Sequence, residues 1–558
     1  MSASTNQRAR IRAQLAERVF DIAIIGGGIN GAAIARDAAL RGYSVVLLEQ
    51  DDFGAGTSSR SSGLLHGGVR YLEHAEFSLV FEALTERTIL ARRARHIARP
   101  IRFIFPIYDD SPRGMFVVNL GMWLYDVLAL YRNYRPHRRL RSSDIRDAMP
   151  PLLHDGLRGA MAYYDYQTDD ARMVLENVLA AQQAGAIALS RLKVLRVVRG
   201  TLNRLELQDM LDGAAASVAA RTVVCAAGPW ADDVLRRGGS TRKPLRPTKG
   251  VHIVLPRERI PIDAAVVLQN AVDRRVMFAL PYFEHTVVGT TDTIYAADPG
   301  EVRATGDDVE YLLEVANAHF PDARVTDEDI ISNWAGVRPL VAQDDNDSPG
   351  AISREHRIDV MLHGWVTIAG GKLTTYRKMA SECVDRVAEL LAERGGPLPA
   401  APAPTAHIPL PGGVGLSSDA DLDRLAARLS KTFRSTAIGR HLAQSYGVRA
   451  LALELLVAED PTLAQPIVAG GTDVWAQLIY GARTELVLTL EDFFIRRTAI
   501  FFRDRDQGLG AIDQAARLLT AELGWDQATQ QARIASYRSE VERNRLWRRE
   551  IRRSLTAA

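Results

Sequence analysis

A glycine-rich turn near the N-terminus constrains the fold more than any other feature of the chain. Phe20 to Ile25 is short, apolar and β-branched, which predicts a buried parallel strand. The glycines at 26–28 predict a tight turn, and Ile29 to Arg41 predicts a helix that ends at Gly42. Tyr43 to Glu49 predicts a second buried strand. Together these elements form a β-α-β unit, which is typical of an α/β fold with a parallel sheet.

Three glycines of this turn, Gly26, Gly28 and Gly31, form the pattern G-x-G-x-x-G. Between a strand and a helix, the first permits the sharp turn, the second lets backbone approach a pyrophosphate, and the third lets the helix pack closely. Glu49 ends the next strand, where a carboxylate accepts hydrogen bonds from ribose hydroxyls and repels a 2′-phosphate. The pattern therefore favours FAD or NAD over NADP.

A polar loop rich in glycine and serine follows from Asp51 to Gly68. Such a loop could wrap a large cofactor with backbone and hydroxyl hydrogen bonds, whereas an NAD domain more often continues with further β-α repeats. Loop statistics alone also allow a solvated loop. We interpret the segment as favouring FAD over NAD.

The rest of the chain predicts both strands and helices. Helices are expected over 72–95 and 171–189, and strands over 191–208, 221–227, 250–256, 276–281 and 286–291. A stretch dense in Pro, Ala and Gly predicts an interdomain linker, and the chain beyond it looks mostly helical. The expected division is a catalytic region over 18–395, the linker over 396–413 and a C-terminal helical domain over 414–558.

Composition excludes several classes of protein. Two cysteines, Cys225 and Cys383, are too few for a disulfide framework or a four-thiolate zinc site, and we expect both to be buried. No H-E-x-x-H pattern occurs, so no metal site is expected. The net charge of +2 and the lack of a reader motif argue against nucleic acid as a partner.

Neither a secretory signal nor a membrane-spanning helix is expected. Residues 1–19 are polar and basic without an apolar core, which favours a cytoplasmic protein. The longest apolar stretch, Met115 to Tyr131, carries Asn119 and Asp126, which are costly at the centre of a bilayer.

A set of short motifs follows the glycine turn in a fixed order. They are TSSRSSGLLHGGVRYLE (57–73), DDARMVLEN (169–177), AAGPWADD (226–233), TKGVHIVLP (248–256), VVGTTDT (287–293), AGVRPL (335–340), SPGAISREH (348–356) and GGKLTTYRKMA (370–380). With the run IIGGGINGAAIARDAALRGYSVVLLE, they resemble the FAD-dependent glycerol-3-phosphate dehydrogenases of aerobic metabolism. The segment YGARTELVLTLEDFFIRRT (480–498) looks like the helical domain that follows the catalytic region in this family.

The resemblance implies a fold and an activity. The fold is α/β, with a Rossmann-like FAD-binding domain interleaved with a mixed-sheet substrate domain, plus a C-terminal mostly helical domain. The activity is oxidation of sn-glycerol 3-phosphate to dihydroxyacetone phosphate by hydride transfer to flavin N5, with electrons passed to a membrane quinone. The resemblance also implies peripheral attachment to the cytoplasmic face of the cell membrane, and it is compatible with a homodimer.

Residues expected to contact FAD lie in the glycine turn, the polar loop and two later motifs. They are Gly26, Gly28, Asn30, Gly31, Glu49, Thr57, Ser58, Ser61, Ser62, Leu65, His66, Gly67, Gly228, Gly371, Lys372 and Thr374.

The substrate is a phosphate dianion with a secondary alcohol, so its site needs basic groups. Arginine suits phosphate because its planar fork matches the oxygens. We expect Arg338 and Arg354 to bind the phosphate, with Lys372, Arg70 and Tyr71 completing the pocket. Taken singly, each arginine could instead be a solvated or ion-paired surface residue.

The hydroxyl proton of the substrate needs an acceptor. His252 is the first candidate, because imidazole titrates near neutral pH; the alternative is a structural histidine beside a strand. His66 is interpreted as a flavin contact. Lys372 could also place positive charge beside the reduced flavin.

Two basic stretches with aromatic residues could lie on anionic lipid. The first runs from Arg99 to Arg141 and contains Arg113, Phe116, Trp123, Tyr125, Tyr131, Arg132, Arg135, Arg138 and Arg139. The second is the tail from Arg543 to Arg553, with Trp547. The alternatives are a solvated helix face for the tail and part of the core for the first stretch.

Three rival functions share the fold or the cofactor. An oxidase would pass its electrons to oxygen and release hydrogen peroxide. A relative that oxidises an amino acid or another hydroxy acid would accept a donor without phosphate. A non-catalytic flavoprotein would be yellow, and no donor would bleach it.

Overall fold

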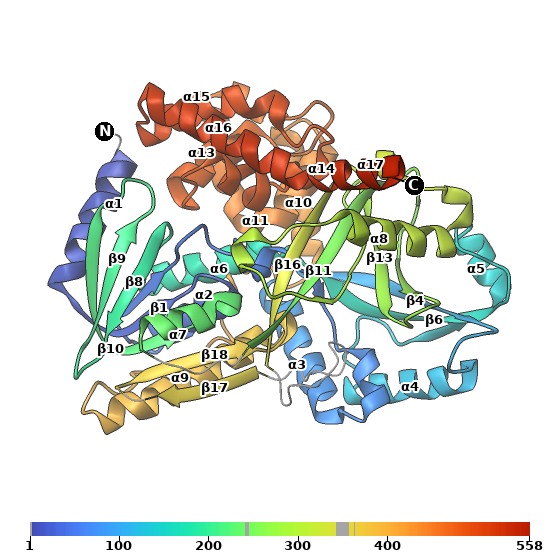
Figure 1. The fold of residues 1–558 in the computed structure, drawn as a ribbon, viewed down its shortest axis with the longest axis horizontal. Coiled ribbons are helices and arrows are strands. Elements are labelled where there is room, and N and C mark those ends of the chain that lie inside the picture. Colours follow the sequence, from blue (N-terminus) through green and yellow to red (C-terminus); the bar gives the residue numbers. More distant parts are fainter. Residues whose placement is uncertain (1–2, 240–244, 342–355, 362, 558) are drawn as a thin grey trace.

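The computed structural model of the protein describes residues 3–239, 245–341, 356–361 and 363–557. Two sheets lie side by side, and a group of helices covers the top of the second sheet in the view of Figure 1. The chain passes repeatedly between the two sheets, so each sheet contains strands from distant parts of the sequence.

The first sheet is built around β1 (Val19–Ile25), which runs parallel to β10 (Ala215–Cys225) on one side and β2 (Val45–Leu48) on the other. The parallel part continues through β18 (Trp365–Gly370) and β7 (Ile187–Leu189). A strand covered on both faces is mostly apolar, and the apolar residues of β1 therefore predicted a buried strand.

The two faces of this sheet have different covers. Helices α2 (Ile29–Leu40), α6 (Asp170–Gln183) and α9 (Tyr376–Glu393) share one hydrophobic core with one face. The opposite face packs against the antiparallel hairpin of β8 (Leu192–Val198) and β9 (Asn203–Asp209). The expected β-α-β unit is therefore present, and it sits at the centre of this layer.

Several predicted elements were wrong in their extent. The helix expected over 72–95 is α3 (Phe77–Arg93), and the strand expected over 221–227 is the end of β10. The strand expected over 191–208 is the β8–β9 hairpin, because the chain turns at 199–202. The helix expected over 171–189 ends at Gln183, because Gly185 has a φ of +96° and starts the connection to β7.

The second sheet is mixed, because it contains both parallel and antiparallel pairs of strands, and its central strands are long. Its strand β11 (Leu245–Pro256) pairs with β14 (His285–Gly289) and β16 (Ser332–Val341). At the far edge lies β3 (Leu64–Leu65), which comes from the polar loop after the glycine turn and pairs with β6 (Leu157–Gln167). The polar loop thus joins the two sheets. The remaining strands are β4 (Arg99–Tyr108), β5 (Arg138–Leu140), β12 (Ala265–Gln269), β13 (Val276–Tyr282) and β15 (Thr293–Ile294), and β17 (His356–Met361) lies at the edge of the first sheet.

The C-terminal region is helical and shares its core with the second sheet. Its largest hydrophobic cluster includes Val254 of β11 and Trp334 of β16. Its helices are α10 (Asp419–Thr432), α11 (Thr436–Tyr446), α12 (Leu451–Glu459), α13 (Trp475–Thr484), α14 (Ile500–Arg503), α15 (Ile512–Leu523), α16 (Gln527–Asn544) and α17 (Trp547–Ala557). The fold class that the resemblance implied is confirmed.

Both cysteines are buried, as expected. Within the described residues, we find no helix with the length and hydrophobicity that crossing a bilayer requires.

Candidate active site

Backbone atoms leave no room for a side chain at two positions of the glycine turn. Gly26 has a φ of +106°, and a Cβ there would lie 2.5 Å from the carbonyl oxygen of Ala226. A Cβ at Gly31 would lie 1.8 Å from the carbonyl oxygen of Gly26. These contacts force glycine at both positions and bring the start of α2 directly above the end of β1.

The N-cap residue of α2 has no side chain that could cap the helix. Gly28 is the N-cap residue, and the backbone N–H of Ile29 donates to the hydroxyl of Ser58 at 2.9 Å. Asn30 is half-buried in the first turn. After the end of the neighbouring strand β10, a Cβ at Gly228 (φ +52°) would meet no atom within 4 Å. Open space therefore lies beside the positive end of a helix dipole, an arrangement that suits an anionic group.

Glu49 lies against the same turn. Its carboxylate accepts hydrogen bonds from the backbone N–H groups of Gly27 at 2.6 Å and Asp51 at 2.7 Å. Burial raises the pKa of Glu49 to about 7. The carboxylate thus stands at the carboxyl end of β2, where the sequence placed the ribose contact.

The polar loop is held by residues of both lobes, that is, of the first sheet with its helices and of the second sheet. Thr57 donates to the carbonyl of Val337 at 2.5 Å, and Ser61 donates to the carboxylate of Asp170. Leu65 is buried, and the N–H of Gly67 donates to the hydroxyl of Tyr125 at 3.0 Å.

A further contact of the loop involves His66 and Thr374. The N–H of His66 donates to the Thr374 hydroxyl at 3.1 Å, and that hydroxyl lies 3.2 Å from the His66 carbonyl oxygen. The polar loop is therefore fixed between the two lobes, and it is not the solvated loop that loop statistics alone would allow.

His252 lies on β11, where the loop meets the second sheet. Its Nε2 lies 2.8 Å from Oγ of Ser62, and its ring stacks on Trp334 with centroids 5.0 Å apart. Burial, with a smaller contribution from the positive charge of Arg338, lowers the pKa of His252 to about 3. The imidazole is consequently neutral at neutral pH.

Arg338 lies on β16, and its guanidinium is held in place by the turn after β14. It donates to Asp292 at 2.8 Å and to the hydroxyl of Thr290 at 3.1 Å. A Cβ at Gly250, on the neighbouring strand, would lie 2.5 Å from its Nη2. The missing side chain at Gly250 makes room for this arginine.

Lys372 and Tyr71, which we expect in the substrate pocket, contact each other. Nζ of Lys372 lies 3.6 Å from the centroid of the Tyr71 ring, which is a cation–π contact. Gly371 has a φ of +83°, and a Cβ there would lie 2.3 Å from the end of the Met379 side chain. Arg70 has an exposed side chain, and Arg354 lies outside the described residues.

Sequence reasoning missed four residues around these groups. Trp334 stacks on His252 and donates from Nε1 to the carbonyl of Ser61 at 3.2 Å. Asp292 and Thr290 hold Arg338, and Asp170 holds Ser61. All except Trp334 lie inside the motifs 169–177 and 287–293, so those motifs carried the signal, but only the folded chain shows what the residues contact.

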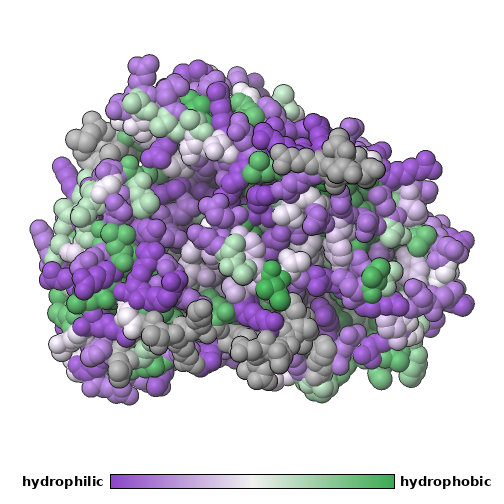
Figure 2. Space-filling view, viewed as in Figure 1, coloured by the Kyte–Doolittle hydropathy of each residue, from purple (hydrophilic) through white to green (hydrophobic). Residues whose placement is uncertain are grey.

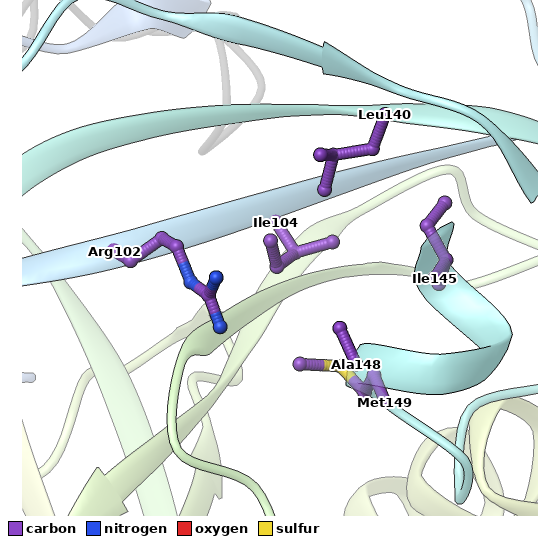
Figure 3. A pocket seen from close by; sticks show the side chains of 6 residues that line it. All are labelled: Arg102, Ile104, Leu140, Ile145, Ala148 and Met149. Atoms are coloured by element: carbon purple, nitrogen blue, oxygen red, sulfur yellow. The ribbon is translucent and has the colours of Figure 1, made fainter. Parts of the chain in front are cut away.

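A small hollow in the second sheet is separate from this site. It is lined by Arg102, Ile104, Leu140, Ile145, Ala148 and Met149 (Figure 3). Its volume of about 10 Å³ holds at most one water molecule, and no predicted site residue lines it.

Comparison with known proteins found family models, relatives and a solved structure that match the chain. Two family models match the chain: "FAD dependent oxidoreductase" over residues 21–377 and "C-terminal domain of alpha-glycerophosphate oxidase" over residues 403–530. The aerobic glycerol-3-phosphate dehydrogenase of Staphylococcus haemolyticus is 37% identical over 95% of this chain and 96% of its own length. The glycerol-3-phosphate dehydrogenase of Synechocystis is 35% identical over 95% of this chain and 98% of its own length. The crystal structure of a Bacillus halodurans glycerol-3-phosphate dehydrogenase complexed with FAD matches with a TM-score of 0.80, at 31% identity over 98% of both chains.

Proposed function

Because the chain belongs to the family of FAD-dependent aerobic glycerol-3-phosphate dehydrogenases, we propose that it binds FAD and oxidises sn-glycerol 3-phosphate to dihydroxyacetone phosphate. The observation that carries this proposal is the contact between Ser62 and His252. It joins the loop expected to hold the flavin to the lobe that carries the candidate substrate residues.

The residues at the glycine turn fit FAD. Gly26 and Gly31 allow the backbone to form the turn, and Gly228 leaves open space beside it. The dipole of α2 favours the pyrophosphate, and the half-buried carboxylate of Glu49 suits ribose hydroxyls. We assign these residues to FAD binding, together with the serines and threonines of the polar loop.

The substrate phosphate carries about two negative charges at neutral pH. We assign its binding to Arg338, which lies on β16, and to Lys372, which is the N-cap residue of the 3₁₀ helix Leu373–Thr375. Asp292 fixes the orientation of the Arg338 guanidinium, which reduces the entropy that binding would otherwise cost. Tyr71, which contacts Lys372, completes this side of the pocket. Arg70 and Arg354 remain proposed ligands for the phosphate.

Bound FAD would supply the acceptor for a hydride from the carbinol carbon. The protein must take the hydroxyl proton, and we assign this step to His252. A neutral imidazole can accept a proton, and the low pKa of His252 in the free site keeps it neutral. A dianionic substrate beside the ring would raise that pKa during binding, because a negative charge stabilises imidazolium.

For the electron acceptor we propose a membrane quinone, with the protein attached to the cytoplasmic face of the membrane. Helix α4 (Met115–Leu128) supports this attachment, because Phe116 is 79% exposed, Leu120 62% and Trp123 52%. These residues, with Val127, follow a helical spacing of three and four and so form one apolar face. Figure 1 places α4 at the lower right edge of the molecule, where Figure 2 shows hydrophobic side chains on the surface.

Exposed basic residues flank α4 in the sequence. Arg113 precedes the helix, and the exposed side chains of Arg132, Arg135, Arg138 and Arg139 follow it. An exposed apolar helix face with basic residues before and after it in the chain fits an anionic lipid surface better than a hydrophobic protein core. Tyr125 does not belong to the face, because it is buried and bonded to Asp165.

The C-terminal tail is a poorer candidate for lipid contact. Trp547, its one aromatic residue, is 1% exposed and belongs to the core beneath α8 (Gly306–His319). Of the two stretches, we therefore propose only the one around α4 as the attachment surface. A homodimer that buries this face is the competing proposal.

The acceptor can be tested with the purified, FAD-loaded protein. Glycerol 3-phosphate should support rapid reduction of a soluble quinone analogue without oxygen, and little hydrogen peroxide should form in air. Peroxide formed in proportion to substrate consumed, with slow quinone reduction, would instead assign the protein to the oxidases.

A further inference from the structure

The loop that follows Glu49 holds the glycine turn from one side. The N–H of Gly54 donates to the carbonyl of Gly27 at 3.0 Å, and the ring of Phe53 occupies the space where a Cβ of Gly27 would lie. With the hydrogen bond from Gly27 to Glu49, this loop (residues 49–54) fixes the backbone on which the proposed FAD site depends.

The same loop is bound by the C-terminal region through a buried carboxylate. Asp52 is completely buried, and it accepts two hydrogen bonds from Arg497, at 2.7 and 3.0 Å. Arg496 donates to the same carboxylate from Nε. Paired hydrogen bonds between a guanidinium and a carboxylate are among the most directional polar contacts in proteins.

Neighbouring charges extend this cluster. Arg191, which follows β7, forms ion pairs with Asp51 at 2.6 Å and with Asp492 at 2.5 Å. Asp492 and both arginines of the Asp52 contact belong to one π-helical turn, Asp492–Arg497. Such turns are rare and are found frequently at functional sites.

We propose that the C-terminal domain positions the FAD-binding loop through Arg496 and Arg497, so that the affinity for FAD depends on their contact with Asp52. The inference rests on the proposed FAD site. It gives the helical domain a role at the cofactor, although its arginines are about 445 residues from Asp52 in the sequence. By linkage, binding of FAD should in turn stabilise the π-helical turn.

The test is a titration of the full-length apoprotein with FAD, followed by flavin fluorescence. Arg497→Met should raise the Kd for FAD at least about tenfold, and Arg497→Lys, which keeps the charge, should give an intermediate value. The matched control is Arg503→Met. Arg503 is another buried arginine of the C-terminal domain, but it contacts Asp473 at 2.7 Å and Glu284 at 3.0 Å, away from the loop.

The control should change the Kd less than about twofold, although both variants should lower the thermal midpoint of the apoprotein. An unchanged Kd in Arg497→Met, or an equal rise in Arg503→Met, would overturn the inference. Failure of the wild-type apoprotein to bind FAD at all would instead overturn the proposed function.

A measurement on the wild-type protein covers the case in which the variant does not fold. Hydrogen exchange of backbone amides should slow on addition of FAD at residues 51–55 and also at 488–498. Slower hydrogen exchange at residues 51–55 alone would show that FAD binding is not coupled to the helical domain, and it would contradict the inference.

Discussion

Ser62 and His252 meet where the two lobes join: Oγ of the serine lies 2.8 Å from Nε2 of a buried imidazole on β11. The serine belongs to the polar loop that follows the glycine turn, and the histidine belongs to the mixed sheet. One hydrogen bond therefore links the proposed cofactor side of the site to its proposed substrate side.

The first prediction concerns the backbone beneath the pyrophosphate. Gly28→Val should give protein with less than about a tenth of the normal flavin content. A Cβ added at Gly28 would lie 3.1 Å from Oγ of Ser58, and the two methyl groups of valine would block the turn. Gly121→Ala is the control, since a Cβ there meets nothing within 4 Å. The ratio of absorbance near 450 nm to that at 280 nm measures flavin content; a fully yellow Gly28 variant would refute the placement.

The second prediction concerns the substrate phosphate. Arg338→Ala should raise KM for glycerol 3-phosphate by about 10- to 100-fold, because one charged hydrogen bond contributes about 1.5–3 kcal/mol. Flavin content should stay normal. Arg259→Ala is the matched control, because Arg259 is also paired with an aspartate, Asp329, at 2.9 Å but lies outside the site. An unchanged KM for the Arg338 variant would remove this arginine from the pocket.

The third prediction uses the lowered pKa of His252. The imidazole has a pKa of about 3 in the folded protein and an ordinary value near 6.5 in the unfolded chain. The unfolded chain therefore binds more protons below pH 6.5, and the folded state loses stability as the pH falls from 6.5 towards 3.

Between pH 7 and pH 5 this loss should amount to about 2 kcal/mol in the wild type and should be absent in His252→Asn. Urea unfolding of the apoprotein at the two pH values measures the difference. The same variant should lower kcat by about 10²–10⁴-fold if the imidazole accepts the proton. Equal pH dependence in both proteins would show that His252 is not the buried neutral group described above.

The fourth prediction concerns the exposed face of α4. Replacement of Phe116 and Trp123 by glutamate should lower binding to vesicles that contain anionic lipid by at least about tenfold, because two large apolar contacts are lost and two repulsive charges are added. Val272→Glu is the control, since Val272 is 93% exposed but lies on a turn of the second sheet. Unchanged vesicle binding, with a change from dimer to monomer in gel filtration, would favour the homodimer interface.

The sequence predicted the local features of the fold well. The β1–α2–β2 unit could be predicted because an apolar strand, a glycine turn and a helix follow one another directly in the sequence. The β8–β9 hairpin was missed, although Gly200 lies at its turn, because apolar and polar residues alternate on both sides of the turn as they would in one long strand.

The side-chain contacts of the candidate site, in contrast, could not be predicted from the sequence. Trp334 reaches His252 only through the register of β16 against β11, and Arg497 reaches Asp52 only after the helical domain has docked. No local pattern encodes such pairs. The motifs indicated which segments gather at the site, while the side-chain partners had to come from the folded chain.

The most direct test of the account is an anaerobic titration of the purified, FAD-loaded protein with glycerol 3-phosphate. Absorbance near 450 nm should fall as substrate is added, whereas glycerol at the same concentration should leave the spectrum unchanged, because it lacks the phosphate that Arg338 and Lys372 are proposed to bind. Flavin that stays oxidised with glycerol 3-phosphate, or that glycerol bleaches equally well, would contradict the account.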